Sequence, residues 1–479
     1  MNNFNRHIKK QRIVKFILVI TPILVSLYLF RFTLNYYFFQ DDWFNFNISA
    51  INSTKELINF LKFRDDIIAY RPLEIQTQYF LIRYIFGLNA FAFRVINFSL
   101  LFISYILLIY LLRNILKNSK AALFSAALWV TSSFHFMNLG MINYHLWGTM
   151  FWLMNFLLIL RFTKTKKNAL YLLSVILYVI SLGIWEFAIS LPIIVTAYLI
   201  YARRFKVVDV LKIFLPFYLI TSVYLIIRHL FVAHLPILEY ETTFNLESLR
   251  ALFWYILWTF NIPEEFKKQI ADNLIFLRGE FLKDFWKLVL VTFSGAVLLI
   301  FLGIIYPLYK TLKNKIVVNF RLITFFFFWF GVAIFPVLLL PNHNFMMYLT
   351  LPSIAIYLFI SYLTFKTNHK YLPYAIFFLW IVLSFVTVRF YRINMFPASY
   401  QKVSNDFVAN IKRKYPYLPP KALVYYHLSF RPDEQALLDQ NAIQALYKDQ
   451  TINIFYTKES LRKFWINTSE KRPVYLYTF

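Results

Sequence analysis

The first apolar stretch of the chain runs from residue 14 to residue 34 and reads VKFILVITPILVSLYLFRFTL. About 20 apolar residues are enough for a helix to cross the hydrocarbon core of a bilayer. The cations Arg6, Lys9, Lys10 and Arg12 precede this stretch, and no small-residue cleavage site follows it. We therefore expect an uncleaved membrane anchor whose N-terminal end lies in the cytoplasm.

Ten further apolar stretches follow the first one. Their approximate ranges are 93–112, 121–138, 144–160, 169–185, 187–202, 211–231, 286–308, 321–340, 348–365 and 371–389. Of the 479 residues 60% are hydrophobic and only 15% are charged, whereas soluble domains carry about 25% charged residues. The sequence predicts an all-α polytopic membrane protein with about 11 transmembrane helices.

The net charge of +27 would indicate a nucleic-acid partner in a soluble protein. Here 22 of the 50 basic residues, and only one acid, Asp209, lie in the N-terminal segment and in every second gap between the apolar stretches. These gaps are Arg113–Lys120, Arg161–Lys167, Arg203–Lys212, Lys310–Arg321 and Lys366–Lys370. Basic loops mark the cytoplasmic side of a membrane protein, so the charge predicts an orientation and no nucleic-acid partner.

The alternation divides the chain into a membrane domain, 1–392, and an extracytoplasmic tail, 393–479. The tail alternates helix-like runs, 398–414 and 433–447, with three strand-like runs, 422–426, 452–456 and 474–477. This alternation predicts a small α/β domain. The membrane domain has two long outer loops, 35–92 and 232–285. Amphipathic stretches at 54–63 and 72–87 predict surface helices in the first loop. In the second loop we expect one helix from Asn245 to about residue 260 and another from Pro263 to about Gly279.

Several kinds of site are excluded by composition. The chain has no Cys, which excludes disulfides, thiolate metal sites and Cys nucleophiles. No Gly-rich phosphate loop and no H-E-x-x-H zinc motif is present. We assign no metal ligands and no cofactor from the sequence, although a requirement for a divalent metal stays open.

An acidic pair, Asp41-Asp42, opens the first outer loop directly after the first apolar stretch. A carboxylate at this place can accept a proton from an acceptor hydroxyl as a general base. The alternative is that the pair only ends the helix and that Trp43 belongs to the aromatic belt of the membrane.

Two other charged residues stand at the entrances of helices. Arg71, before Pro72, can orient the acidic pair or bind a phosphate, or it can contact a lipid headgroup. Glu186 lies at a tight turn between two apolar runs, where an ionisable residue is costly and thus a functional candidate. Snorkelling of Glu186 to the interface is the alternative.

Cations also occur on the outer side, where membrane topology does not require them. Arg94, Arg228 and Arg389 lie at the outer ends of three spans, and as a group they can hold an anionic lipid phosphate. Each of them alone can equally be a headgroup anchor. The polar clusters Asn143-Tyr144-His145 and Asn342-His343-Asn344 are expected to line the same cavity, although interfacial hydrogen bonding also explains His145.

Together these residues resemble the GT-C superfamily of polyprenyl-phosphate-dependent glycosyltransferases, over about residues 13–365. The matching motifs are Asp41-Asp42; Tyr70-Arg71-Pro72-Leu73 with Phe86-Gly87-Leu88-Asn89-Ala90 and Asn97; Glu186 with Pro192; and Trp329, Pro336 and Met347-Tyr348-Leu349-x-x-Pro352-Ser353. Trp185 stands where the family has a Lys, and Met347 where it has an Arg. These two departures remove cations that the relatives use for the donor phosphate.

The resemblance implies an inverting sugar transfer from a polyprenyl-phosphate donor to an unidentified acceptor at the outer face of the membrane. It implies that Asp41 is the base and that Asp42 assists or orients it. The expected donor-phosphate ligands are Arg71, Arg94, Arg228, His343 and Arg389, and the expected cavity residues are Glu186, His145, Asn143 and Tyr348. A transporter or flippase of a lipid-linked sugar is the alternative, although such proteins more often place ionisable residues at the membrane midplane.

Overall fold

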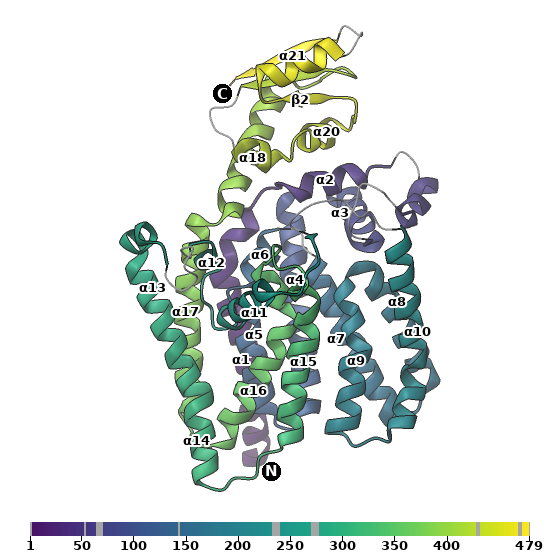
Figure 1. Ribbon diagram of the computed structural model, residues 1–479. Coiled ribbons are helices and arrows are strands. Elements are labelled where there is room, and N and C mark those ends of the chain that lie inside the picture. The colour runs from purple at the N-terminus through teal and green to yellow at the C-terminus, as the bar shows by residue number, and fades with distance from the viewer. Residues whose placement is uncertain are drawn as a thin grey trace.

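The structure, a computed structural model, describes residues 2–51, 54–63, 70–141, 144–231, 240–269, 277–427, 432–467 and 472–478. Long helices stand side by side in a bundle, and a small C-terminal domain lies at the end opposite the N-terminus (Figure 1). The bundle elements are α1 (Asn2–Phe30), η1 (Arg31–Asn35), α4 (Ala90–Leu116), α5 (Ser119–Val130), α7 (Tyr144–Thr165), α8 (Asn168–Ile184), α9 (Ser190–Ala197), η5 (Tyr198–Ala202), α10 (Val207–Phe231), α13 (Gly279–Ile300), η7 (Phe301–Ile305), α14 (Tyr306–Lys313), α15 (Phe320–Leu338), α16 (Pro352–Lys366) and α17 (Leu372–Asn394).

Each of the eleven apolar stretches corresponds to a helix of this bundle. Within the described residues, seven helical segments are long and apolar enough to cross a membrane. They are Phe16–Asn35, Ala90–Leu116, Tyr144–Thr165, Val207–Phe231, Gly279–Lys313, Phe320–Leu338 and Leu372–Asn394. Four apolar segments are shorter, with 10–17 residues: Ser119–Val130, Asn168–Ile184, Glu186–Ala202 and Pro352–Lys366. The fold is that of a multi-pass integral membrane protein.

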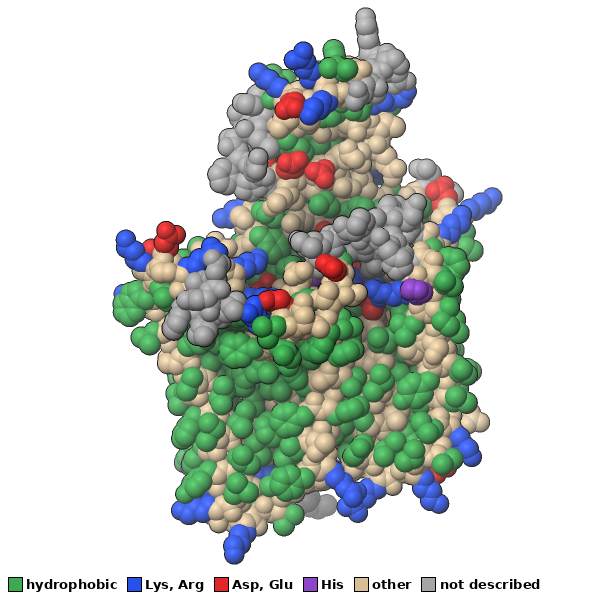
Figure 2. Space-filling model, in the orientation of Figure 1, with side chains coloured by type: hydrophobic (Ala, Val, Ile, Leu, Met, Phe, Trp, Pro, Cys, Tyr) green, Lys and Arg blue, Asp and Glu red, His purple; other side chains and the backbone are tan. Residues whose placement is uncertain are grey.

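The surface of the bundle agrees with a position in a membrane. Apolar side chains cover its flank, and Lys and Arg side chains gather at the end away from the C-terminal domain (Figure 2). Large apolar residues such as Leu219, Val297 and Phe378 are exposed on this flank. A lipid environment removes the cost that exposing so much apolar surface to water would carry.

Shorter elements cover the end of the bundle that faces the C-terminal domain. They are α2 (Asp41–Ile48), η2 (Thr54–Leu61), η3 (Pro72–Gln78), α3 (Tyr79–Phe86), α6 (His135–Gly140), η4 (Glu186–Ile189), α11 (Leu246–Trp258), α12 (Glu265–Lys268) and η8 (Met346–Thr350). The helical stretch from Pro72 ends at Gly87, whose φ of 62° favours glycine. One expectation was wrong: Gly279 begins the long helix α13 instead of ending a helix that starts at Pro263. Glycine often follows the last residue of a helix, but here it is the first residue of α13.

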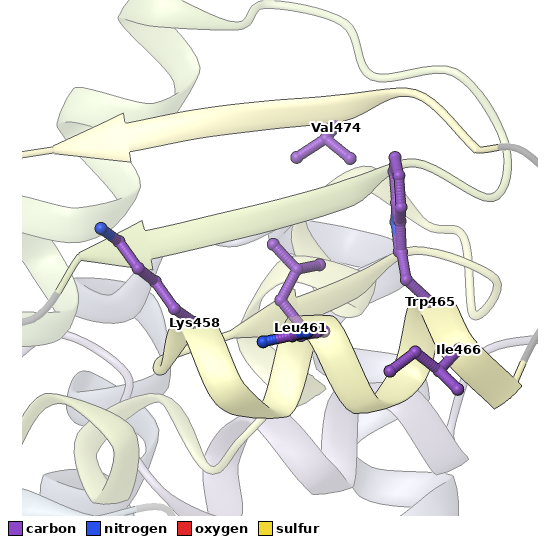
Figure 3. A pocket seen from close by; sticks show the side chains of 6 residues that line it. Lys458, Leu461, Trp465, Ile466 and Val474 are labelled. Carbon is purple, nitrogen blue, oxygen red and sulfur yellow. The ribbon is translucent and has the colours of Figure 1, made fainter.

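The C-terminal domain is a three-stranded parallel sheet, in the order β2-β1-β3, with helices around it. Its elements are α18 (Phe396–Lys414), β1 (Leu423–His427), α19 (Pro432–Leu437), α20 (Asn441–Tyr447), β2 (Asn453–Phe455), α21 (Lys458–Asn467) and β3 (Val474–Thr478). A groove of about 520 Å³ runs between α21 and β3, lined by Leu461, Trp465 and Val474 among others (Figure 3). This groove lies on the far side of the domain from the bundle (Figure 1).

The same domain shares a core with α2, in the loop between η1 and α4. Phe407 of α18 and Tyr426 of β1 belong to one buried apolar cluster with Trp43 and Phe46 of α2. Trp43 Nε1 also donates a hydrogen bond to Ser404 Oγ at 2.8 Å. The C-terminal domain therefore braces the helix that begins with the acidic pair.

Candidate functional site

The acidic pair forms the first turn of α2. The chain reverses direction just before it at Gln40, whose φ of 46° lies in a region that residues other than glycine seldom adopt. The Gln40 N–H donates to the carbonyl oxygen of Ala436 in the C-terminal domain at 2.8 Å, which holds this turn. Two carboxylates at the N-terminus of a helix are favoured by its dipole. The turn and the domain contact thus place Asp41 and Asp42 together at the start of α2.

Asp42 is fully enclosed and hydrogen-bonded on both carboxylate oxygens. Tyr79 donates to Oδ1 at 3.0 Å, while Arg94 and the N–H of Phe39 donate to Oδ2 at 3.2 and 3.3 Å. Burial raises the pKa of Asp42, and Arg94 together with these hydrogen bonds opposes that rise. A carboxylate held in this way is suited to orienting its surroundings.

Arg94 does not occupy the place expected of a phosphate ligand. Its side chain is 0% exposed, and besides Asp42 it donates to the carbonyl oxygens of Tyr36 and Tyr37 at 3.2 and 3.0 Å. A guanidinium closed in by protein has no route to a lipid phosphate. We therefore reassign Arg94 from donor binding to positioning of the segment that leads into α2.

Asp41 differs from its neighbour because its side chain is accessible. It is nevertheless surrounded by protein on its other sides, and this burial raises its pKa to about 6. The charge of Asp42 adds to the rise, whereas Arg71 lowers the pKa. An accessible carboxylate with a pKa near neutrality is suited to accept a proton.

Arg71, Glu186 and Arg228 form a cluster of charges beside Asp41. Arg71 Nε donates to both carboxylate oxygens of Glu186 at 2.9 and 2.8 Å, and Arg228 Nη1 lies 3.3 Å from Oε1. The guanidinium of Arg71 also lies over the ring of Tyr144, 3.7 Å from its centroid. Two cations share one carboxylate, so the cluster carries an excess positive charge that an anion can balance.

The position of Arg71 follows from its local sequence. Pro72 occupies the first turn of η3 and leaves Arg71 as the residue before the helix. The following residue, Leu73, packs against Gly183 at the end of α8, where an added Cβ would approach Leu73 Cδ1 to 3.0 Å. This close packing brings Arg71 to Glu186, which follows α8 after one intervening residue.

Rings and imidazoles surround the charged cluster. Phe187 stacks on Tyr348 with centroids 5.9 Å apart, and His145 meets Tyr348 edge-on at 5.2 Å. His343 lies 4.4 Å from the ring of Tyr240 and 6.1 Å from that of Tyr348. Burial lowers the pKa of His343 to about 4, and Arg71 lowers it further. His343 is therefore neutral at pH 7, so it can contribute a hydrogen bond to a ligand but no charge.

Trp185, at the turn that leads to Glu186, is a packing residue. Trp185 is fully buried, stacks on Phe187 with centroids 4.8 Å apart and contacts His145 edge-on at 5.3 Å. It also fills the space beside Gly148, where an added Cβ would lie 2.3 Å from Trp185 Cε3. The cations of the charged cluster are Arg71 and Arg228.

Sequence reasoning missed two groups of acids. Glu74, three residues after Arg71, is buried beside the site. Glu264 accepts a hydrogen bond from the Met346 N–H at 2.7 Å and so holds η8, the element that carries Tyr348. Burial raises the pKa values of Glu264 and Glu265, and the charge of Glu264 adds to the rise at Glu265. The scarcity of acids in this chain marks these residues in the same way as it marks Asp41-Asp42 and Glu186.

One expected site residue lies outside the cluster. Arg389 is exposed on α17, and no described contact joins it to Asp41 or Arg71. Asn143 lies outside the described residues. No group of three or more His, Asp or Glu side chains that could hold a metal ion occurs in the part of the chain that the structure describes.

Comparisons with known proteins gave one kind of match. No protein-family model matches the sequence, and no curated protein matches it. Among solved structures, the chain is similar to ArnT from Cupriavidus metallidurans, crystallised with bound undecaprenyl phosphate. The match covers 95% of this chain and 89% of ArnT, at 13% sequence identity and a TM-score of 0.41. A likeness at this level does not assign an activity, because one fold hosts many functions.

Proposed function

We propose that the protein is an inverting glycosyltransferase that moves a sugar from a polyprenyl-phosphate donor to an acceptor hydroxyl. One observation carries the proposal: an accessible carboxylate, Asp41, lies beside the positively charged cluster of Arg71, Glu186 and Arg228, at the end of a membrane helix bundle. A base and a phosphate-binding cluster are the two parts that this reaction needs. The resemblance of the surrounding motifs to the GT-C superfamily points to the same chemistry.

The reaction that we propose uses the two parts at opposite ends of the substrate. The acceptor O–H gives its proton to Asp41, and the acceptor oxygen forms a bond to the anomeric carbon from the face opposite the phosphate. The bond between that carbon and the phosphate oxygen breaks, and its electron pair leaves with polyprenyl phosphate. Arg71 and Arg228 stabilise the charge that develops on the leaving phosphate. Attack opposite the leaving group inverts the anomeric configuration.

We further propose that the site faces the outer side of the membrane. The basic loops lie at the opposite end of the bundle, where Figure 2 shows a row of Lys and Arg side chains. Basic loops are retained in the cytoplasm, which leaves the site and the C-terminal domain outside. The apolar flank gives a polyprenyl chain access from the bilayer to the charged cluster.

The proposal is tested with the purified protein in lipid vesicles, supplied with a panel of polyprenyl-phosphate sugars. Release of polyprenyl phosphate is measured for the wild type, for Asp41→Asn and for Glu280→Gln, a control that removes an exposed acid from α13. We expect release by the wild type and the control, and a loss of about 10²–10⁴-fold in Asp41→Asn. Movement of intact donor across the membrane without cleavage, and independent of Asp41, would instead show a transporter.

A further inference from the structure

Glu74 is a third carboxyl group at the candidate site. It belongs to η3, a short π-helical element that begins immediately after Arg71. Its side chain is only 2% exposed. π-Helical turns are rare and occur frequently at functional sites. The element thus brings Arg71 and a buried acid into the same site.

The hydrogen bonding around Glu74 is incomplete for an ionised carboxylate. Its Oε2 is buried and has no hydrogen-bond partner among the described residues. Asp42, by contrast, receives hydrogen bonds from Tyr79, Arg94 and the Phe39 N–H. Burying a charge without donors is strongly unfavourable, and such a group keeps its proton instead. The two buried acids therefore differ in how well their surroundings support a negative charge.

The carboxyl groups that face Glu74 disfavour its ionisation, and the cation Arg71 opposes them. Its neighbours are the cation Arg71, the carboxyl groups of Glu186, Asp41 and Asp42, and the phenols of Tyr79 and Tyr144. The only cation in this set is already bonded to both oxygens of Glu186. Burial raises the pKa of Glu74 to about 8, Arg71 opposes the rise, and the three other carboxyl groups add to it.

We propose that Glu74 is a positioning residue that holds a proton in the working site. Its neutrality leaves Arg71 committed to Glu186 and to the donor phosphate, and leaves Asp41 as the reactive carboxylate. This inference rests on the proposed function for its catalytic consequence. The charge state of Glu74 itself can be measured without any substrate.

The consequence is an upper pH limit for donor binding. As the pH rises through about 8, Glu74 ionises and places a further negative charge beside Arg71. That charge competes for Arg71 and repels the anionic donor, so the donor KM rises about fivefold between pH 8 and pH 9 as the neutral fraction falls. The stability of the folded state also declines as the pH rises. Because folding raises the pKa of Glu74, its contribution to stability is complete below about 4.5 and is lost as the pH rises through about 8.

The first experiment reads the proton directly. Infrared spectra of the purified protein in lipid nanodiscs are recorded from pH 5 to pH 10 for the wild type and Glu74→Gln, and the spectra are subtracted. We expect a protonated-carboxyl band that is present at pH 7 and disappears near pH 8. Glu264→Gln provides the matched control, since it removes a different buried acid and leaves the Glu74 band in place. A difference spectrum without a protonated band at pH 7 overturns the proposal.

The second experiment connects the proton to activity. We expect Glu74→Ala to lower kcat/KM for the donor at least tenfold at pH 7, and Glu74→Gln, which keeps the shape and the neutral charge, to restore most of this loss. The donor KM of Glu74→Gln should stay flat between pH 7 and pH 9. A folded Glu74→Gln that is as inactive as Glu74→Ala contradicts the proposal. If the wild type releases no polyprenyl phosphate from any donor, the proposed function fails while the infrared result still decides the charge state of Glu74.

Discussion

Two ion pairs lie close together at the end of the bundle, and they are built differently. Asp42 and Arg94 are 1% and 0% exposed, and their bonds are made to protein groups. Glu186 and Arg71 are 12% and 17% exposed, and Arg228 approaches the same carboxylate while 37% exposed. The first pair is closed to a ligand, whereas the second pair is open to one.

The difference indicates that the closed pair has a structural role and that the open pair can bind a ligand. The closed pair joins α4 to the segment that leads into α2 and so fixes the base of the acidic turn. The open pair carries an excess positive charge, and Arg71 reaches Glu186 through Nε alone. Its guanidinium also lies over the ring of Tyr144, and we propose that its terminal nitrogens bind the donor phosphate. A charged side chain can bind a ligand only where the surrounding protein leaves some of its hydrogen-bond donors unoccupied.

Breaking the closed pair should have the largest effect on stability. Arg94→Met removes one partner and leaves Asp42 buried, which costs about 3–5 kcal/mol of folding free energy. Thermal unfolding of the purified protein in detergent should show a large drop in Tm. Arg71→Met in the more open pair is the matched comparison, and its Tm should fall much less. Equal losses of Tm in the two variants would contradict the distinction.

Weakening the open pair should weaken binding of the sugar donor. Arg228→Gln should raise the donor KM roughly tenfold, because a charged hydrogen bond to phosphate is lost, and should leave the acceptor KM and the Tm nearly unchanged. Arg389→Gln removes an exposed Arg that lies outside the cluster, and it should leave the donor KM as in the wild type. Steady-state kinetics with each substrate varied in turn will show whether the two variants differ; if they do not, Arg228 has no special role.

The smallest expected effect is a loss of activity at acidic pH. Because its pKa is raised to about 6, Asp41 is protonated as the pH falls below that value, and kcat/KM should decline there. The stability effect has the opposite direction: the contribution of Asp41 is complete below 3.8 and is lost as the pH rises through about 6. Asp41→Asn should therefore be at least as stable as the wild type at pH 7. A kcat/KM that is constant from pH 5 to pH 7 would argue against Asp41 as the base.

Much of the fold could be predicted because it depends on apolar runs alone. Every apolar stretch corresponds to a helix, and the basic loops lie together at one end of the bundle. The three strand-like runs of the tail are strands, but α21 was not predicted, because Lys458–Asn467 carries charges on most of its turns. A glycine alone also does not distinguish the end of one helix from the start of the next, as Gly279 shows.

The site could be predicted only as a set of residues. Scarce acids and misplaced cations identified Asp41, Arg71 and Glu186, and these three lie together. Which cation meets which acid depends on how each helix is rotated, so the pairing of Arg94 with Asp42 could not be read from spacing. For the same reason the roles of Glu74 and His343 depend on burial, which the sequence does not specify.

The central claim is that Asp41 is the reactive carboxylate and that Asp42 supports it. Single-turnover release of polyprenyl phosphate at pH 7, measured with the Tm for Asp41→Asn and Asp42→Asn, tests it most directly. We predict that Asp41→Asn loses transfer by about 10²–10⁴-fold with an unchanged or higher Tm, whereas Asp42→Asn lowers the Tm. Full transfer by a folded Asp41→Asn protein would contradict the account.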